Sequence, residues 1–141
     1  MVNINYLAVL VSAVVSMVLG SLWYGPLFGK RWMALSGINP DMMNDPKAKA
    51  AMGKSYSIMF VGSLLMSYVL AHAIVFASAY LKVEGIAAGL MAGLWNWMGF
   101  IAPVTLGTVL WEGKSWKLWF LNNGYQLVYL LLAGVILSVW K

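Results

Sequence analysis

Residues 85–126 read GIAAGLMAGLWNWMGFIAPVTLGTVLWEGKSWKLWFLNNGYQ, and this stretch decides the fold. An apolar segment is followed by a short turn that contains Glu112 and Lys114, and then by a second apolar segment. The first segment exceeds the roughly 18 residues that cross a bilayer as a helix. A short turn makes consecutive helices antiparallel neighbours. The stretch therefore predicts two adjacent membrane-spanning helices.

The whole chain has the composition of a membrane protein. Of its 141 residues, 62% are hydrophobic and only 9% are charged, whereas a soluble domain carries about 25% charged residues. The apolar residues form four runs, at 4–22, 57–81, 86–111 and 118–140. Backbone groups in lipid must be paired, and continuous runs of this length exclude a β-barrel. We predict a single all-α integral membrane domain over 1–141, a four-transmembrane-helix bundle.

Several function classes have no support in the sequence. The chain has no cysteine, which excludes disulfides and thiolate metal sites. We find no catalytic triad, no phosphate-binding loop and no repeated His or acid spacing, so we expect no enzyme activity, no metal and no cofactor. The net charge of +5 is concentrated in one loop and does not indicate nucleic-acid binding. No basic residue precedes the first apolar run, so we expect it to be a helix rather than a cleaved signal.

Residues 25–54 form the longest polar connection between the predicted helices. Gly25-Pro26 ends the first helix, and the basic segment after it begins a short helix that we place at the membrane interface. Asp45-Pro46 is typical of an N-cap followed by proline at the first helical position. The second helix should therefore begin well outside the bilayer.

Most basic residues lie on one side of the predicted bundle. The 25–54 loop and the 112–117 turn hold Lys30, Arg31, Lys47, Lys49, Lys54, Lys114 and Lys117. The opposite side holds only Lys82 and Lys141 of the nine Lys and Arg residues. Because basic residues collect in cytoplasmic loops, we predict a multi-pass protein of the cell membrane. Its 25–54 loop and 112–117 turn would be cytoplasmic and both termini would lie outside.

A stripe of small residues follows one face of the 86–111 helix. It consists of Gly85, Gly89, Gly93, Gly99, Pro103 and Gly107, with Asn96 on the same face. Small residues let membrane helices approach closely. We expect this face to pack on the ridge of the first helix formed by Ala8, Ser12, Ser16 and Gly20, or on that ridge in a second copy. Proline removes a helix hydrogen bond, so the alternative is a hinge or an ion-coordinating break at Pro103.

His72 and Asn96 are the polar side chains predicted nearest the centre of the bilayer. An unpaired polar group in hydrocarbon costs several kcal/mol. Antiparallel helices would bring the two side chains to a similar depth, so we predict a hydrogen bond between them. This pair would act either as interhelical glue or as a site for a proton or a small polar ligand.

The densest polar group lies around the 112–117 turn. One side is a face of the 86–111 helix, with Thr105, Thr108 and Glu112. The other side is the start of the 118–140 helix, with Asn122, Asn123 and Gln126. The cluster would either fix a helical hairpin or bind a headgroup, an anion or a substrate. Glu112 is the only acid expected near the hydrocarbon border, so its protonation state is the main question there.

Four fragments in sequential order resemble one known family. They are S-x-x-L-G-S-L-W-Y-G-P-L-F-G-K-x-W at 16–32, M-S-Y-V-L-A at 66–71, G-F-x-A-P at 99–103 and W-E-G-K-x-W-K-L-x-x-x-N-x-G-Y-Q-L at 111–127. The chain is similar to the small bacterial and fungal membrane proteins catalogued as domain of unknown function 1761. The resemblance implies a four-helix membrane protein without an assigned activity. It also implies a His after Tyr125 in relatives, where this chain has Gln126.

The sequence is compatible with three different functions. The resemblance places on the family pattern Trp23, Tyr24, Pro26, Pro103, Glu112, Gly113, Asn122, Gly124 and Tyr125. Our first hypothesis is a structural or interaction protein that lies in the lipid bilayer. It would form a homo-oligomer, with a dimer favoured, or bind another membrane protein. The alternative is a small transporter or channel with a path lined by His72, Asn96, Thr105 and Glu112. The second alternative is a membrane enzyme that binds a lipid or substrate at the polar cluster.

Overall fold

The structure is a computed structural model that describes residues 3–140. Four helical segments are long and apolar enough to cross a membrane, namely Tyr6–Leu27, Pro46–Leu81, Gly85–Leu110 and Trp116–Val139. The described residues contain no β-strand. The predicted four-helix, all-α membrane architecture is therefore confirmed.

The first span is interrupted near its end. Its α-helical part, α1 (Tyr6–Leu22), begins where the Asn5 side chain accepts hydrogen bonds from two backbone N–H groups of the first turn. A π-helical turn, η1 (Trp23–Leu27), follows, and Gly25 within it has φ −109° and ψ −107°. The chain then enters the short helix α2 (Gly29–Ser36). The α-helical part of the span therefore ends at Leu22, just before the Gly25-Pro26 pair that the sequence predicts as its end.

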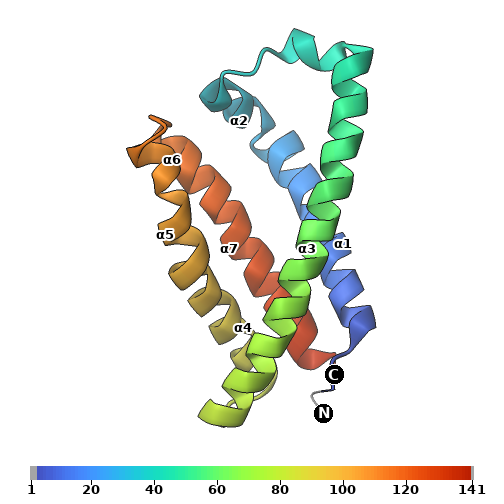
Figure 1. Cartoon of the computed structure of the whole chain (residues 1–141), viewed down its shortest axis with the longest axis vertical. Coiled ribbons are helices and arrows are strands. Elements are labelled where there is room, and N and C mark those ends of the chain that lie inside the picture. Colours follow the sequence, from blue (N-terminus) through green and yellow to red (C-terminus); the bar gives the residue numbers. More distant parts are fainter. Residues whose placement is uncertain (1–2, 141) are drawn as a thin grey trace.

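The second span is the longest helix of the protein. After the short 3-10 turn η2 (Pro40–Asn44), α3 (Pro46–Leu81) begins at the Asp45-Pro46 pair, and Asp45 Oδ1 accepts a hydrogen bond of 2.9 Å from the Lys47 N–H. The helix therefore starts before the predicted membrane segment 57–81. Figure 1 shows its first turns extending past the other spans, where η2 connects them to α2.

The third span is broken into four pieces and the fourth is continuous. The pieces are α4 (Gly85–Asn96), the π-helical turn η3 (Trp97–Ile101), α5 (Ala102–Thr105) and α6 (Gly107–Leu110). Because Pro103 has no N–H to donate, the break that it predicts takes the form of this π-helical turn. The fourth span, α7 (Trp116–Val139), begins where Ser115 Oγ accepts a hydrogen bond of 3.2 Å from Leu118 N.

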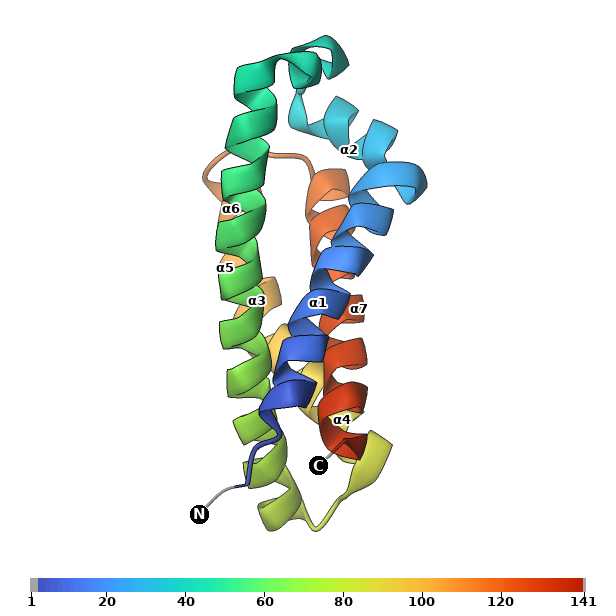
Figure 2. The same ribbon diagram turned by 90° about the vertical axis from the view of Figure 1, so that its right-hand side faces the viewer.

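Helix α7 holds the bundle together, because it contacts the other three spans and α2. The buried core lies where α1, α3, α4 and α7 meet and includes Ala8, Leu70, Ile74, Ala88, Ala92, Tyr129, Leu130 and Ala133. Figures 1 and 2 show that α1 begins and α7 ends at the same end of the bundle, opposite α2. Toward the α2 end, α3 diverges from α7 and α5 (Figure 1). This divergence positions the site described next.

Candidate functional site

The glycine stripe of the third span packs against α7. An added Cβ at Gly89 would overlap the carbonyl oxygen of Gly134, and one at Gly93 would lie 2.6 Å from the carbonyl oxygen of Leu130. The predicted partner, the ridge of the first helix at Ala8, Ser12, Ser16 and Gly20, was therefore wrong for these two glycines. A Cβ at Gly85 or Gly99 would meet nothing within 4 Å.

The glycines after Gly93 do not contact α7, because the π-helical turn η3 changes the direction in which the later residues point. A π-helical turn contains more residues than an α-helical one, so the residues after η3 are rotated relative to a continuous α-helix. Gly99 and Pro103 are exposed, and the nearest atom to an added Cβ at Gly107 is 3.5 Å away on the Trp111 ring. Trp97 instead continues the contact, and its Nε1 donates a hydrogen bond of 3.0 Å to the Asn123 carbonyl oxygen.

The predicted hydrogen bond between His72 and Asn96 does not form. His72 Nδ1 lies 2.9 Å from the carbonyl oxygen of Tyr68, and Asn96 Nδ2 donates to the carbonyl oxygen of Ala92 at 2.8 Å. Each side chain thus finds its partner one turn earlier in its own helix. Because that partner is local, neither residue has to reach a neighbouring helix, and the prediction was wrong.

The predicted polar cluster divides into two parts. Thr105 Oγ1 donates to Asn123 Oδ1 at 3.0 Å, which joins the third and fourth spans as expected. Thr108 instead donates to the carbonyl oxygen of Thr105 in its own segment. Glu112 is exposed, because α6 ends at Leu110 and the chain turns away at Gly113, which has φ 69°. Glu112 therefore forms no hydrogen bond with Asn122 or Asn123, although the sequence places all three in one predicted cluster.

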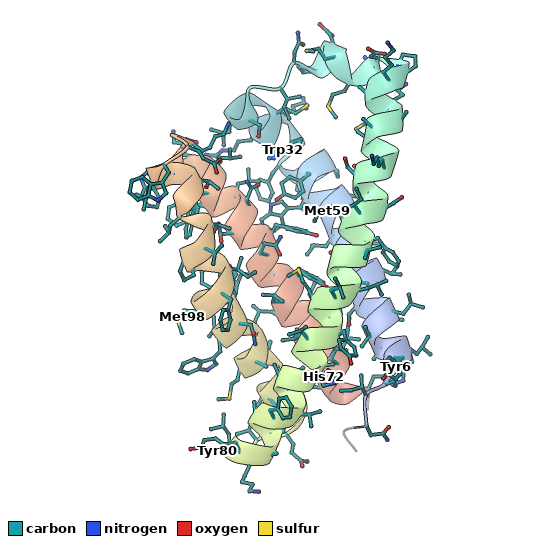
Figure 3. The ribbon with its side chains drawn as sticks, in the orientation of Figure 1. Tyr6, Trp32, Met59, His72, Tyr80 and Met98 are labelled. Carbon is teal, nitrogen blue, oxygen red and sulfur yellow. The ribbon has the colours of Figure 1, made fainter. Side chains whose placement is uncertain are left out.

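A cavity of about 680 Å³ lies at the α2 end of the bundle, between α1, α2, α3 and α7. Four residues of the predicted cluster line it, namely Thr105, Asn122, Asn123 and Gln126. Its apolar wall includes Met17, Trp32, Ile38, Met43, Met52 and Met59. Figure 3 shows Trp32 and Met59 on the two sides of the space between α2 and α3, whereas Met98 and Tyr80 point away from the bundle.

Tyr24, Asn122 and Gln126 form a polar part of the cavity wall. Tyr24, which η1 carries into the cavity, donates its hydroxyl to Asn122 Oδ1 at 3.0 Å. Its ring packs on Tyr125, with ring centres 5.3 Å apart. Gln126 Oε1 is buried and has no hydrogen-bond partner among the described residues. Gln126 lines the cavity, but this oxygen is covered by the surrounding protein atoms.

Buried hydroxyl groups form the end of the cavity nearest the bundle centre. Ser16 Oγ shares hydrogen bonds with Ser63 Oγ at 2.9 Å and with the Tyr125 hydroxyl at 3.0 Å. One turn deeper, the hydroxyls of Ser67 and Tyr129 lie 2.8 Å apart. Small residues expected from the sequence only to smooth the helix faces thus also supply hydrogen bonds between α1, α3 and α7.

Four residues that the transporter hypothesis places on one path do not share a cavity. Thr105 lines the large cavity. Asn96 lines a second cavity of about 270 Å³ between α3 and the third span. His72 and Glu112 line neither of the two cavities. Within residues 3–140, no group of three or more His, Cys, Asp or Glu side chains is arranged to hold a metal ion.

Sequence reasoning missed the aromatic and methionine residues of the cavity. In the sequence, Tyr24 is distinguished only by its place on the family pattern, and Trp32 only as the last residue of the 16–32 fragment. The ten methionines of the chain could have indicated a binding surface, because methionine is frequent in adaptable binding surfaces. Four of them line this one cavity (Met17, Met43, Met52 and Met59).

The fold and the cavity define a class: a multi-pass α-helical membrane protein with a pocket that none of the described charged residues lines. Within that class, the chain belongs to the family described as "Protein of unknown function (DUF1761)", whose model matches residues 7–138. No curated protein and no solved structure matches the chain. The family assignment confirms the resemblance carried by the four sequence fragments.

Proposed function

We propose that this protein binds a small amphipathic molecule in the cavity at the α2 end. The observation that carries the proposal is the cavity of about 680 Å³ itself, which is lined both by apolar side chains and by the side chains of Asn122 and Gln126.

The make-up of the cavity supports the same function. Small-molecule sites usually have volumes of about 300–1,000 Å³ and a mostly apolar lining with a few convergent polar groups. Here an apolar wall of methionines faces the amides of Asn122 and Gln126. An amphipathic molecule would place its polar end at these amides and its apolar part against the methionines.

Two matched variants of α3 test this proposal. Ser55 lines the cavity and Ser57 does not, yet each hydroxyl donates to the carbonyl oxygen four residues earlier and each residue is exposed. We expect Ser55→Phe to fill the cavity and Ser57→Phe to leave it open. The probe is 1-aminoanthracene, a neutral amphiphile whose fluorescence rises in apolar surroundings, added to the purified protein in detergent.

The expected result is saturable binding to the wild type and to Ser57→Phe, and a loss of at least about tenfold in affinity for Ser55→Phe. Signals would be corrected with protein-free micelles. Equal binding to both variants, or no saturable binding to the wild type, would overturn the proposal, because the probe would then bind only to detergent or to the lipid-facing surface.

We also infer that the α2 end of the protein faces the cytoplasm. The argument is the excess of basic residues in the 25–54 loop and the 112–117 turn, which the positive-inside rule places on that side. Because the chain has no cysteine, Met42→Cys and Glu84→Cys each create a single thiol. In intact cells, a membrane-impermeant maleimide should label the Glu84 variant only, and the reverse pattern would invert the orientation.

A structural role, homo-oligomerisation and the binding of another membrane protein stay predictions from the sequence. A transporter with its path along His72 and Glu112 is the less favoured proposal, because neither residue lines the two cavities described here.

A further inference from the structure

The large cavity is open on one side, beside the start of the membrane segment of α3. Tyr56 and Met59 both line the cavity, yet they are 56% and 53% exposed. The membrane segment predicted from the sequence begins at residue 57, and tyrosine is typical of the border between lipid headgroups and acyl chains. The opening should therefore face a leaflet of the bilayer, so that a lipid could enter the cavity sideways.

The wall of the cavity combines two surfaces that match the two parts of a lipid molecule. The methionines, among them Met52 and Met59 of α3, give an apolar surface that adapts to a flexible chain. On α7, the amide nitrogens of Asn122 and Gln126 have no hydrogen-bond partner among the described residues, and an amide nitrogen only donates. The ester carbonyl oxygens of a phospholipid only accept, so they complement these donors.

The protein around the opening is basic. The 25–54 loop contains five basic residues and two acidic ones, and a basic cluster directly beside a membrane span attracts anionic lipids. Met52 and Met59 share one face of α3, because they are two helical turns apart. Lys49 lies three residues before Met52 and continues this face, whereas Lys47 lies on the opposite side of the helix. Both lysines are exposed.

We infer that the cavity binds one acyl chain of an anionic membrane phospholipid, which enters beside α3 and places its headgroup near Lys49. The inference rests on the proposed function and names the class of ligand for the same cavity. The lipid comes from the leaflet at the α2 end of the protein rather than from water. Three features carry this inference: the opening at the membrane border, the unpaired amide donors and the basic residue on the cavity face of α3.

Photoactivatable lipids test the inference in a bilayer. The purified full-length protein is reconstituted into phosphatidylcholine vesicles with a trace of phosphatidylglycerol that carries a diazirine in the middle of one acyl chain. After irradiation, mass spectrometry quantifies the adducts on Met17 and Gln126, which line the cavity from α1 and α7 and are only partly exposed. Adducts on Val104, which is 74% exposed and lines neither cavity, report lipid at the outer surface of the bundle.

We expect the phosphatidylglycerol probe to label Met17 and Gln126 as well as Val104. Ser55→Phe should lose most of the labelling of Met17 and Gln126 and keep that of Val104, because the phenyl ring fills the cavity. Ser57→Phe should keep all of it, since Ser57 does not line the cavity. Labelling of Val104 alone in the wild type would show surface lipid only and would overturn the inference.

The headgroup is tested with the same diazirine chain on zwitterionic phosphatidylcholine. We expect cavity labelling, relative to Val104, to be about fivefold weaker than with phosphatidylglycerol, the equivalent of about 1 kcal/mol for one basic residue near a membrane surface. Lys49→Gln should remove this preference, and Lys47→Gln is the matched control that should keep it. Equal labelling by the two probes, or equal loss in the two variants, would overturn the selection of an anionic headgroup by Lys49.

Failure of the lipid inference and failure of the proposed function give different results. If 1-aminoanthracene binding in detergent depends on Ser55 but cavity labelling by lipid does not, the ligand is not a bilayer lipid and the binding function stands. If 1-aminoanthracene binding does not respond to Ser55→Phe, the proposed function itself fails.

Discussion

The two ends of α7 meet their neighbours in opposite ways. Near its end, Gly134 lies against Gly89 of α4 so closely that neither position has room for a Cβ. Near its start, Asn122 and Gln126 face a cavity of about 680 Å³. A single helix thus belongs both to a crossing with no room for a Cβ and to the wall of the large cavity. The difference shows that side-chain size and polarity, rather than hydrophobicity, decide how closely these helices approach.

The surrounding lipid explains why the two ends of α7 can differ in this way. Lipid chains are as apolar as a leucine side chain, so helices in a bilayer gain little from hiding apolar surface and associate through packing and hydrogen bonds. The Gly89–Gly134 crossing uses packing alone. At the α2 end the rings of Tyr24 and Tyr125 lie between α1 and α7 and are fixed by hydroxyl hydrogen bonds. Both rings line the cavity that the divergence of α3 from α7 leaves beside them.

The largest effect is expected from a change at the tight crossing. Gly89→Ala places a methyl group onto the Gly134 carbonyl oxygen, and such overpacking typically costs about 1–3 kcal/mol or more. We expect a loss of stability of about 3 kcal/mol, measured by denaturant-induced unfolding of the purified protein in mixed micelles. Gly62→Ala is the control, since a Cβ there meets nothing within 4 Å.

Gly62→Ala should be neutral or slightly stabilising, because alanine is the better helix former. If the two alanine variants had equal stability, the close approach of α4 and α7 would not be a feature of the protein, and the contrast between the two ends of α7 would disappear.

An intermediate effect is expected from the buried hydroxyl between the two regions. Tyr129 is 1% exposed, and its hydroxyl bonds Ser67 Oγ and donates to the Ser63 carbonyl oxygen. Tyr129→Phe should lower the free energy of unfolding by about 1–2 kcal/mol, the usual range for a lost hydrogen bond between membrane helices. The same unfolding assay measures it, with Tyr68→Phe as the control because Tyr68 is 40% exposed.

A large loss for Tyr68→Phe, or none for Tyr129→Phe, would contradict the importance of this hydroxyl pair. The affinity for 1-aminoanthracene should change little in either variant, because neither tyrosine lines the large cavity.

The smallest effect is expected from Glu112, which the sequence singles out. This carboxylate is exposed and lines neither of the two cavities. We expect Glu112→Gln to change stability by less than about 0.5 kcal/mol and to leave 1-aminoanthracene affinity unchanged within the error of the titration. A clear loss of probe binding would place Glu112 at the cavity and contradict the separation described above.

Much of the fold is predictable because its signals are local. Long apolar runs require spans, Asp45-Pro46 marks the start of α3, and Pro103 marks the interruption of the third span. Part of the site is also predictable, since Thr105 and Asn123 share a hydrogen bond. These features depend on a few neighbouring residues and on one short turn.

The rest of the site depends on tertiary packing, which local sequence patterns do not determine. The side chains of His72 and Asn96 could bond either to a neighbouring helix or to a carbonyl oxygen one turn earlier, and in the structure both bond to the local carbonyl oxygen. The position of Tyr24 depends on how η1 redirects the chain. The cavity depends on the divergence of α3 from α7, which no single residue encodes.

The π-helical turn η3 also has a consequence for comparing relatives of this protein. Each residue of an α-helix turns the chain by about 100°, so the extra residue in this turn decides which of the later side chains face α7. A relative that lacks one residue between Trp97 and Ile101 would present a different side chain where Thr105 meets Asn123. A one-residue gap belongs in an alignment at this turn, and an ungapped alignment would pair residues whose side chains point about 100° apart around the helix.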